Sequence, residues 1–447
     1  MKGSLFRKIF LAVGDWASLY LSLFLMIRIS YGANWLADWD IHLRPFSWIF
    51  PIWIATLYAT YLYETRFFRF NIDTLRTIGV AVVIASIASV IAFYAFPPGL
   101  IHPRRDMILF APIYFIILMG WRWITYKILR NQVKTNLIFL GGDAEVKELQ
   151  KYFKENAQLG YTSLGSISIS DGDYLQKIRD KIASNGVSLV VVHAPTNNPE
   201  FTQQLFALLS NKVTIIDLEE FYERTFNMVA PNILTDTWFI KNLENLSLDF
   251  YLFTKRVFDI LFSVFGLILT IPLYPIIALL IKLDSKGPVF IRQARVGKNN
   301  LPYSIYKFRT MKAIGPGGLA ETKGPIYATP GDERITKIGK ILRTSHIDEL
   351  PQLWNILGGS MSLVGPRPIR PEFTDKLRKN IPYYDMRHLV KPGLTGWAQI
   401  NYGYGITIKD EYIKLQYDIY YAKKQSLVLD MAIILKTIRS VFLKLGR

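Results

Sequence analysis

The sequence predicts a membrane protein of mixed α and α/β class, built from three successive parts. Long apolar runs predict an N-terminal bundle of four membrane-spanning helices over residues 1–134. Strand-like and helix-like segments alternate over 135–240, as in a soluble, Rossmann-like module with a parallel sheet. Residues 250–447 carry a fifth apolar run and amphipathic helices, which predict a domain seated on one face of the membrane.

The composition excludes several classes of protein and of site. Of the 447 residues, 51% are hydrophobic and 14% are aromatic, which is too many for a disordered chain. The chain has no cysteine, so disulfide scaffolds, thiolate zinc sites, iron–sulfur clusters and cysteine nucleophiles are excluded. A net charge of +18 leaves two classes of partner, namely nucleic acid and an anionic membrane surface.

The distribution of charge decides between these two partners. Residues 1–134 carry 14 basic and 6 acidic side chains, 135–240 carry 8 and 13, and 241–447 carry 31 and 16. The excess of positive charge therefore flanks apolar runs and does not lie on an isolated soluble domain. This pattern favours membrane lipids as a partner and argues against nucleic acid.

Four apolar runs account for the predicted bundle: 9–27, 46–63, 77–96 and 107–121. A bilayer core needs about 20 apolar residues, and the fourth run reaches that length only if Arg122 extends to the membrane surface. Flanking basic residues predict that both ends of the bundle are cytoplasmic, although Arg104 and Arg105 on an outer loop run against this orientation. A soluble bundle of core helices is the disfavoured alternative, because uncharged runs this long are rare in soluble folds.

The middle block predicts a parallel sheet with crossover helices. Strands are expected at 135–141, 164–169, 187–193 and 213–218, and helices at 144–156, 174–184 and 199–209. The first strand ends in Gly141-Gly142-Asp143, but the third glycine of a dinucleotide-binding turn is missing. We therefore favour a regulatory or assembly module over one that binds a dinucleotide.

The fifth apolar run is predicted to form a re-entrant helix over residues 257–282. Pro272 and Pro275 interrupt the run, and each removes a backbone donor. Basic residues lie on both sides of it, so both ends are expected on the cytoplasmic side. The alternative is a kinked full span, which would place the most basic block of the chain outside the cell.

Two segments after this helix are rich in basic residues. Basic and apolar residues alternate over 306–311, which predicts a strand with Lys307 and Arg309 on one cationic face, or an ordinary solvated face. Basic residues then recur every three positions from Arg334 to Arg343, as on an amphipathic helix. Such a stripe suits lipid headgroups or a phosphate.

Asp348 and Glu349 follow that stripe and are expected at a helix N-terminus, because Pro351 favours a first turn and Gly358 a helix end. The macrodipole and nearby Arg343 are expected to favour the ionised forms of both carboxyls. Two roles remain open from spacing alone. The pair caps the helix, or Asp348 is a nucleophile on phosphorus while its neighbour holds a divalent cation beside a pyrophosphate.

Three later features are also candidates. Arg367 lies between two prolines, a rigid setting that suits a phosphate contact, and residues 391–399 are expected to form a turn-rich surface loop. Asp418 and Asp430 lie in aromatic surroundings and either support the site or are simply capped and solvated. The tail, 427–445, is expected to lie flat on the membrane.

Together these motifs resemble the bacterial sugar transferase family, the monotopic phosphoglycosyl transferases. The resemblance covers about residues 250–447 and rests on KRVFDI, RVG, YKFRTM, ERITKIGKILRTSHIDELPQLWNIL, SLVGPRP and KPGLTGWAQI, in that order. With the N-terminal four-helix membrane domain and the Rossmann-like module, the chain is similar to the large form of this family, the polyprenyl glycosylphosphotransferases.

The resemblance implies a reaction and its residues. A sugar 1-phosphate would pass from a UDP-sugar to undecaprenyl phosphate, with release of UMP and through a covalent phosphosugar intermediate. Asp348 would be the nucleophile, and Asp348 and Glu349 would bind Mg²⁺ or Mn²⁺. The residues implied in binding substrate or phosphate are Lys307, Arg309, Arg343, Arg367, Asp418 and Asp430.

The resemblance also implies a place in the cell. The catalytic domain would lie on the cytoplasmic face of the bacterial inner membrane and perform the first membrane step of exopolysaccharide, O-antigen or capsule synthesis. A homodimer through the N-terminal parts is left open, and a non-catalytic assembly protein that binds anionic lipid is the alternative. Residues 399–405 depart from the family pattern, so contacts there are unassigned, and His346 stands where an apolar residue is usual.

Overall fold

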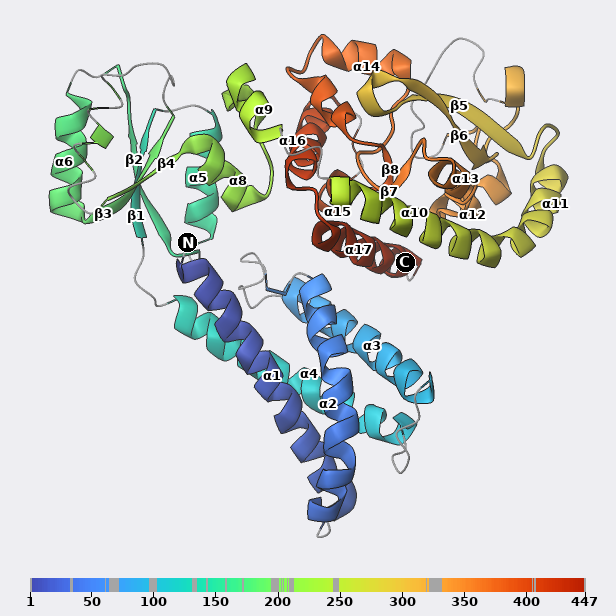
Figure 1. The fold of residues 1–447 in the computed structure, drawn as a ribbon, viewed down its shortest axis with the longest axis horizontal. Coiled ribbons are helices and arrows are strands. Elements are labelled where there is room, and N and C mark those ends of the chain that lie inside the picture. Colours follow the sequence, from blue (N-terminus) through green and yellow to red (C-terminus); the bar gives the residue numbers. More distant parts are fainter. Residues whose placement is uncertain are drawn as a thin grey trace. The chain divides into compact units, whose positions relative to one another are not determined.

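The computed structural model of the chain divides into two compact units, Met1–Asp217 and Leu218–Arg447 (Figure 1). The residues whose placement is described are 2–32, 35–60, 62–63, 72–95, 103–130, 135–141, 144–156, 159–170, 173–193, 201, 203, 205–206, 208, 213–243, 249–318, 320, 332–403, 405 and 407–445.

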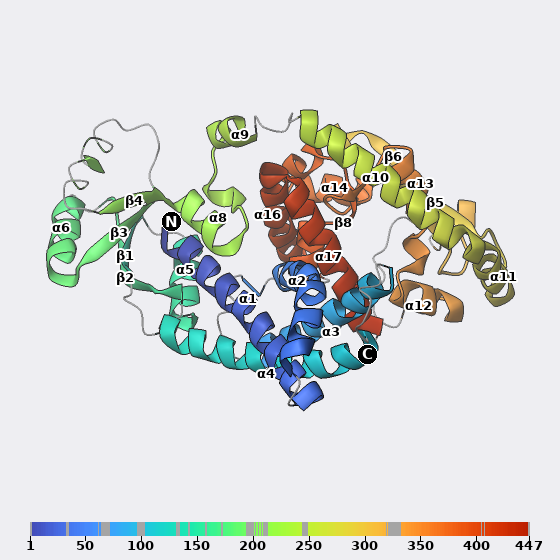
Figure 2. The same ribbon diagram turned by 60° about the horizontal axis from the view of Figure 1, so that its bottom comes forward.

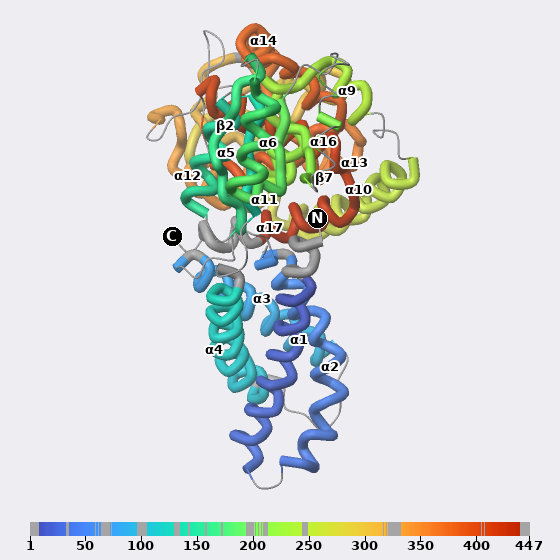
Figure 3. Tube along the Cα trace, turned by 90° about the vertical axis from the view of Figure 1, so that its left-hand side faces the viewer, coloured from blue at the N-terminus to red at the C-terminus, as the bar shows by residue number. Residues whose placement is uncertain are grey.

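The first unit begins with a bundle of helices: α1 (Lys2–Tyr31), α2 (Trp35–Ala59), α3 (Ile72–Ala95) and α4 (Pro103–Arg130). Each helix packs on the next, and α4 closes against α1 (Figure 3). Phe46, Trp53 and Phe110 lie in its core among aliphatic side chains. By length and composition, α1, α3 and α4 qualify as membrane spans.

The second helix of the bundle differs from the predicted second span. α2 begins at Trp35 and ends at Ala59, and it is not among the helices of the described residues that are long and apolar enough to span a membrane. It nevertheless packs against both α1 and α3. That α2 crosses the membrane therefore stays a prediction.

An ion pair is buried inside the bundle. Nη2 of Arg122 donates to Oδ2 of Asp15 over 2.6 Å, and both side chains are buried. Nη1 of Arg122 also donates to the carbonyl oxygen of Leu62. Arg122 therefore does not extend to the membrane surface, and α4 is nevertheless long and apolar enough to span a membrane. The charge of Arg122 is instead offset by Asp15, which explains why each interrupts an otherwise apolar run.

The α/β part contains a parallel four-stranded sheet in the order β2-β1-β3-β4, which confirms the predicted sheet. Its elements are β1 (Thr135–Leu140), α5 (Ala144–Glu155), β2 (Tyr161–Ile167), α6 (Tyr174–Asn185), β3 (Val187–Val192) and β4 (Thr214–Asp217). Helices α5 and α6 cover opposite faces of the sheet (Figure 1). The predicted helix at 199–209 lies mostly outside the described residues, as do Gly142 and Asp143.

The second unit combines helices with short sheets. Its elements are α8 (Leu218–Phe226), α9 (Asp236–Leu243), α10 (Asp249–Thr270), α11 (Tyr274–Asp284), β5 (Phe290–Val296), β6 (Pro302–Phe308), α12 (Lys337–Thr344), α13 (Gln352–Leu357), β7 (Ser362–Val364), α14 (Pro371–Arg378), β8 (Gly393–Thr395), α15 (Trp397–Asn401), α16 (Ile408–Lys424) and α17 (Leu427–Leu445). Strands β5 and β6 form an antiparallel hairpin, and β7 pairs in parallel with β8.

Residues 218–243 contact the C-terminal part of the chain, although the sequence grouped them with the α/β module. The Val229 amide donates to the carbonyl oxygen of Gln416 over 3.1 Å. Glu223 pairs with Lys423 over 2.7 Å. Helices α8 and α9 therefore support α16.

The fifth apolar run is a broken helix. α10 leads into α11 through a 3₁₀ turn at Ile271–Leu273, with Pro272 inside the turn and Pro275 in the first turn of α11 (Figure 2). The stretch Asp249–Asp284 is long and apolar enough to meet a membrane. The exposed side chains of this helix pair are mainly large and apolar, among them Phe253 and Leu279.

The opposite face of α10 forms hydrogen bonds with α13 and β7. Arg256 donates to the carbonyl oxygens of Ile356 and Leu357 over 2.6 and 2.7 Å, at the C-terminal end of α13. Asp259 accepts hydrogen bonds from the Leu363 amide, over 2.9 Å, and from the Ser362 hydroxyl. One helix thus carries an apolar surface on one side and satisfies backbone groups on the other.

The segment at 391–399 is buried, which contradicts the predicted surface loop. It forms β8 and the start of α15, and Pro392, Gly393 and Trp397 are buried. The chain passes very close to the residue after β7, because a Cβ on Gly365 would lie 2.2 Å from the carbonyl oxygen of Lys391. Turn-forming residues here permit close backbone packing and not exposure.

We predict that Gly365→Ala destabilises the second unit, because the added methyl group overlaps backbone that cannot move aside. Such overpacking costs about 1–3 kcal/mol and should lower the midpoint of thermal unfolding by several degrees. Gly403→Ala is the matched control, since nothing lies within 4 Å of a Cβ built there. The measurement is size-exclusion chromatography after heating. Equal midpoints of thermal unfolding for the two variants would show that the close approach of the backbone at Gly365 does not limit the size of this residue.

Candidate active site

The paired carboxyls lie in a tight turn between two helices. The hydroxyl of Thr336 accepts a hydrogen bond from the Gly339 amide and caps α12. His346 then adopts a left-handed conformation with φ of 58°, and the chain turns into a 3₁₀ segment, Ile347–Glu349, before α13. This confirms the predicted helix start near Pro351, which occupies the N-cap position. Asp348 and Glu349 therefore both lie in this short 3₁₀ segment.

Glu349 is held by cations from two other segments. Lys307 of β6 approaches Oε1 of Glu349 with its Nζ at 2.6 Å, and Arg367 approaches the same oxygen with its Nη2 at 2.8 Å. In the described part of the chain, Oε2 accepts no hydrogen bond. Glu349 therefore joins β6 to the segment after β7 and keeps one oxygen available.

Asp348 is buried and lacks such partners. Its side chain is 8% exposed and forms no hydrogen bond or ion pair with any described residue. Lys307, Arg343 and Arg367 lie near enough for their charges to act on it. Nη1 of Arg343 is itself buried without a hydrogen-bond partner among the described residues, so it is available to an anionic oxygen.

The two carboxyls differ in acidity. Burial raises the pKa of Asp348 to about 6, against the opposing pull of Lys307, and the charge of Glu349 adds to the rise. Burial would also raise the pKa of Glu349, but Arg367 and Lys307 outweigh it and hold that pKa well below its usual value. Arg343 favours the ionised form of Asp348, as expected, but burial has the larger effect, so the pKa of this carboxyl is raised.

Arg309 has a different environment from Lys307. It is buried, and its guanidinium donates to the carbonyl oxygens of Ser285 and Lys286 over 2.6 and 2.5 Å, and more weakly to that of Ile281. These groups lie at the end of α11, so Arg309 caps that helix and contacts neither Asp348 nor Glu349. The alternating sequence pattern alone does not show that Lys307 contacts a carboxylate whereas Arg309 caps a helix.

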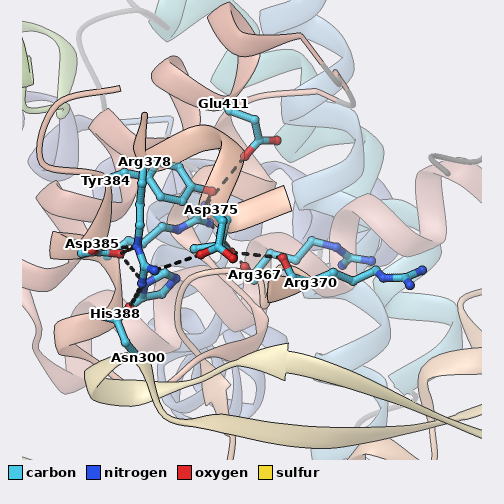
Figure 4. Close-up of polar contacts among 11 residues, drawn as sticks. Asn300, Arg367, Arg370, Asp375, Arg378, Tyr384, Asp385, His388 and Glu411 are labelled. Atoms are coloured by element: carbon cyan, nitrogen blue, oxygen red, sulfur yellow. Dashed lines mark hydrogen bonds and ion pairs between the residues drawn. The ribbon is translucent and has the colours of Figure 1, made fainter. Parts of the chain in front are cut away.

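Asp418 belongs to a buried cluster behind Arg367. It lies 2.7 Å from Nη2 of Arg387, and the other end of that guanidinium donates to the Tyr384 hydroxyl and lies 3.7 Å from Glu411. Figure 4 shows Tyr384 and Glu411 of this cluster. Burial raises the pKa of Asp418 to about 6, although Arg387 opposes the rise.

Arg387 connects this cluster to the carboxylate site. Its Nη2 also donates to the carbonyl oxygen of Arg367 over 3.3 Å, so it fixes the backbone that presents the Arg367 side chain to Glu349. Arg387 and Glu411 were not predicted from the sequence. No periodic pattern marks them, because their partners lie on separate segments and meet only in the fold.

Asp430 lies in a third environment. It accepts hydrogen bonds from the hydroxyls of Tyr251 and Tyr421 over 2.9 and 2.7 Å, and Lys255 lies 2.7 Å away. These contacts tie α17 to α10 and α16. The structure thus brings Lys307, Arg343 and Arg367 to the two carboxyls, whereas Arg309, Asp418 and Asp430 make their contacts elsewhere.

A divalent cation would fit the carboxylate pair. Among the described residues, no group of three or more potential metal-binding side chains occurs. Mg²⁺, however, is usually held by one or two carboxylates together with waters and substrate phosphates. The available Oε2 of Glu349 and the unpaired carboxyl of Asp348 supply such a donor set.

Residues 250–444 match the family model described as bacterial sugar transferase. The chain is 46% identical over 196 residues to a UDP-N-acetylgalactosamine-undecaprenyl-phosphate N-acetylgalactosaminephosphotransferase of Aeromonas hydrophila, which covers 44% of this chain and 45% of the relative. It is 41% identical over 265 residues to a UDP-glucose:undecaprenyl-phosphate glucose-1-phosphate transferase of Xanthomonas campestris, which covers 57% and 53%. These matches span about half the length of each relative.

A shorter relative is matched almost completely. The chain is 42% identical over 191 residues to the exopolysaccharide production protein PSS of Rhizobium leguminosarum, which covers 42% of this chain and 94% of that protein. The part of the chain that the family model matches begins in α10 and contains both the broken helix and the carboxylate site.

We predict that Arg387→Leu destabilises the protein strongly, because Asp418 would be left as a buried carboxylate without its cation, whereas Glu411 keeps its pair with Lys414. Breaking a buried pair in this way costs about 3–5 kcal/mol. Arg378→Leu is the matched control, since Arg378 pairs with Asp375 and Asp385 at the surface, where pairs contribute about 0–1 kcal/mol. The midpoint of thermal unfolding should be clearly lower for purified Arg387→Leu than for Arg378→Leu. Similar midpoints would show that the buried Arg387 cluster contributes no more to stability than the surface pairs.

Proposed function

The chain belongs to the bacterial sugar transferase family, and we propose that it transfers a sugar 1-phosphate from a UDP-sugar to undecaprenyl phosphate and releases UMP. The observation that carries the proposal is the buried, unpaired carboxyl of Asp348, with a pKa of about 6, beside a Glu349 that is held ionised by two cations. The names of the Aeromonas and Xanthomonas relatives supply the donor and acceptor classes.

The reaction would proceed in two displacements at one phosphorus. A carboxylate oxygen of Asp348 attacks the phosphorus that bears the sugar, and the bond between that phosphorus and the UMP oxygen breaks. An oxygen of the lipid phosphate then attacks the same phosphorus and releases Asp348. A pKa of about 6 leaves this carboxylate mostly ionised at neutral pH while keeping it more basic than an ordinary aspartate.

The surrounding cations would stabilise the charge of the donor. Arg343 has a buried donor nitrogen without a partner, which is suited to an oxygen of the pyrophosphate. Lys307 and Arg367 hold Glu349 in place, and Arg367 is partly exposed and within reach of a bound phosphate. Asp348 and Glu349 would hold Mg²⁺ or Mn²⁺, and such a metal, when bound, offsets the negative charge of the pyrophosphate.

The proposal includes a location for the reaction. The broken helix α10–α11 would enter one leaflet of the bacterial inner membrane and return, because basic residues lie on both sides of it. The carboxylate site would then face the cytoplasm, where UDP-sugars are available. Such a product is the lipid-linked sugar that begins exopolysaccharide, O-antigen or capsule synthesis. The relatives differ in the sugar they are named for, so a hexose and an N-acetylhexosamine are both candidates.

We predict that Asp348→Asn abolishes release of UMP, because an amide cannot attack phosphorus. The measurement is UMP formed by the full-length protein in detergent, from a panel of UDP-sugars, with and without undecaprenyl phosphate. Rates for the active protein should fall about tenfold between pH 8 and pH 5. The sign follows from the raised pKa, since the nucleophilic carboxylate form is lost as the pH falls through about 6.

Asp375→Asn is the matched control, because Asp375 is an exposed aspartate on α14. It should retain activity. Turnover by a folded Asp348→Asn protein would rule out this nucleophile, and anionic-lipid binding by the unmodified protein without UMP release from any UDP-sugar would favour a non-catalytic assembly protein.

The topology can be tested with introduced cysteines, since the chain has none. We predict that cysteines replacing Lys255 and Lys286, which flank the broken helix, both react with an impermeant thiol reagent only from the cytoplasmic side. A cysteine replacing Asp40, on the predicted outer side of the bundle, should react from outside and serves as the control. Labelling of position 286 from outside would establish a full span instead.

A further inference from the structure

A cavity of about 250 Å³ lies in the second unit, and neither Asp348 nor Glu349 lines it. It is bounded by α10, by the segment leading into β8 and by the end of α16. Four of its lining side chains are basic, namely Lys255, Arg256, Lys298 and Lys391, and the acidic one is Asp259. None of the residues that surround Asp348 lines this cavity.

The positive charge of the cavity is only partly balanced by the protein. Lys255 pairs with Asp430, whereas Arg256 donates to uncharged carbonyl oxygens of α13. The side chains of Lys298 and Lys391 form no hydrogen bond or ion pair with any residue that the structure describes. Three cationic groups therefore face one carboxylate, and an anion within the cavity would be attracted by the remaining charge.

Lys391 is the cation most affected by this surplus. Burial lowers the pKa of its ammonium group, the positive charges of Arg256 and Lys298 lower it further, and Asp259 opposes them. Its backbone cannot move away, because the neighbouring Pro392 carbonyl accepts the Ser362 amide within the β7–β8 pair. A bound phosphate would relieve the repulsion between these fixed cations.

The size and the remaining walls of the cavity indicate the kind of anion. About 250 Å³ is below the roughly 300–1,000 Å³ of pockets for drug-sized ligands, so a headgroup fits better than a whole nucleotide sugar. Leu252 and Leu389 contribute apolar surface beside the cations. The outer face of the same stretch of α10 exposes Phe250 and Phe253, which suits the membrane boundary.

We propose that this cavity binds the phosphate group of a membrane lipid, at a site separate from Asp348 and Glu349. The proposal goes beyond the transfer reaction and does not depend on it. It also gives a role to Lys391 and the segment around it, which the reaction proposed above does not use.

The test is protection of Lys391 from acetylation by acetic anhydride in the full-length protein, followed by peptide mass spectrometry. The probe is dihexanoyl phosphatidic acid in a neutral detergent. At ten times its dissociation constant, it should slow acetylation of Lys391 about tenfold. Lys409, an exposed lysine on α16, should react at the same rate throughout and is the internal control. Unchanged acetylation of Lys391 would overturn the proposal.

Two further probes distinguish the source of the anion. Inorganic phosphate should protect Lys391 only at much higher concentration, and protection at equal concentration would overturn the assignment to a lipid. Dihexanoyl phosphatidylcholine should protect weakly, because its choline group opposes the basic wall. Equal protection by this zwitterionic lipid would show that the cavity recognises apolar chains and not an anionic headgroup.

Variants at an exposed residue test the charges without endangering the fold. Lys298→Gln should raise the phosphatidic acid concentration needed for half-protection several-fold, since it removes one cation from the wall. Lys409→Gln removes the same charge from the distant end of α16 and should leave the concentration unchanged. If the two variants behave alike, the local charge of the cavity does not determine binding, and the proposal fails.

Discussion

The ion pairs of Glu349 are the interaction on which the site depends. One carboxylate oxygen is shared by Lys307 from a hairpin and Arg367 from the segment after β7, so three separate parts of the chain meet at one atom. Buried ion pairs repay their desolvation only when the geometry is good. Here the pairing also neutralises the cations that would otherwise make Asp348 strongly acidic, and it leaves Asp348 with the higher pKa of the two.

Much of the architecture was predictable because it follows from the periodicity of apolar residues and from the positions of prolines and glycines. The parallel sheet, the break near Pro272, and the helix between Pro351 and Gly358 all occur where the local pattern placed them. The three cations around the carboxyls were also within reach of sequence reasoning. Their motifs are short and dense in charge, and the fold brings them together.

Tertiary contacts determined the features that the sequence could not predict. Arg309 resembles Lys307 in the strand pattern, yet only the fold shows that its guanidinium meets the end of α11. The raised pKa of Asp348 also required the fold, because the burial that causes it depends on residues far away in the chain. Likewise, the run of prolines and glycines before Trp397 suggested exposure, whereas the same residues allow a close backbone crossing that side chains would prevent.

The two faces of α10 have a practical consequence for protein engineering. Because its outer face is apolar, deleting the helix is an obvious way to obtain a fragment that needs no detergent. Deletion would also remove Arg256 and Asp259, which satisfy the last carbonyls of α13 and the amide of Leu363. Unsatisfied groups of this kind cost about 1–3 kcal/mol each. A more promising route to a tractable fragment is to retain the helix and replace its exposed phenylalanines and leucines with polar residues.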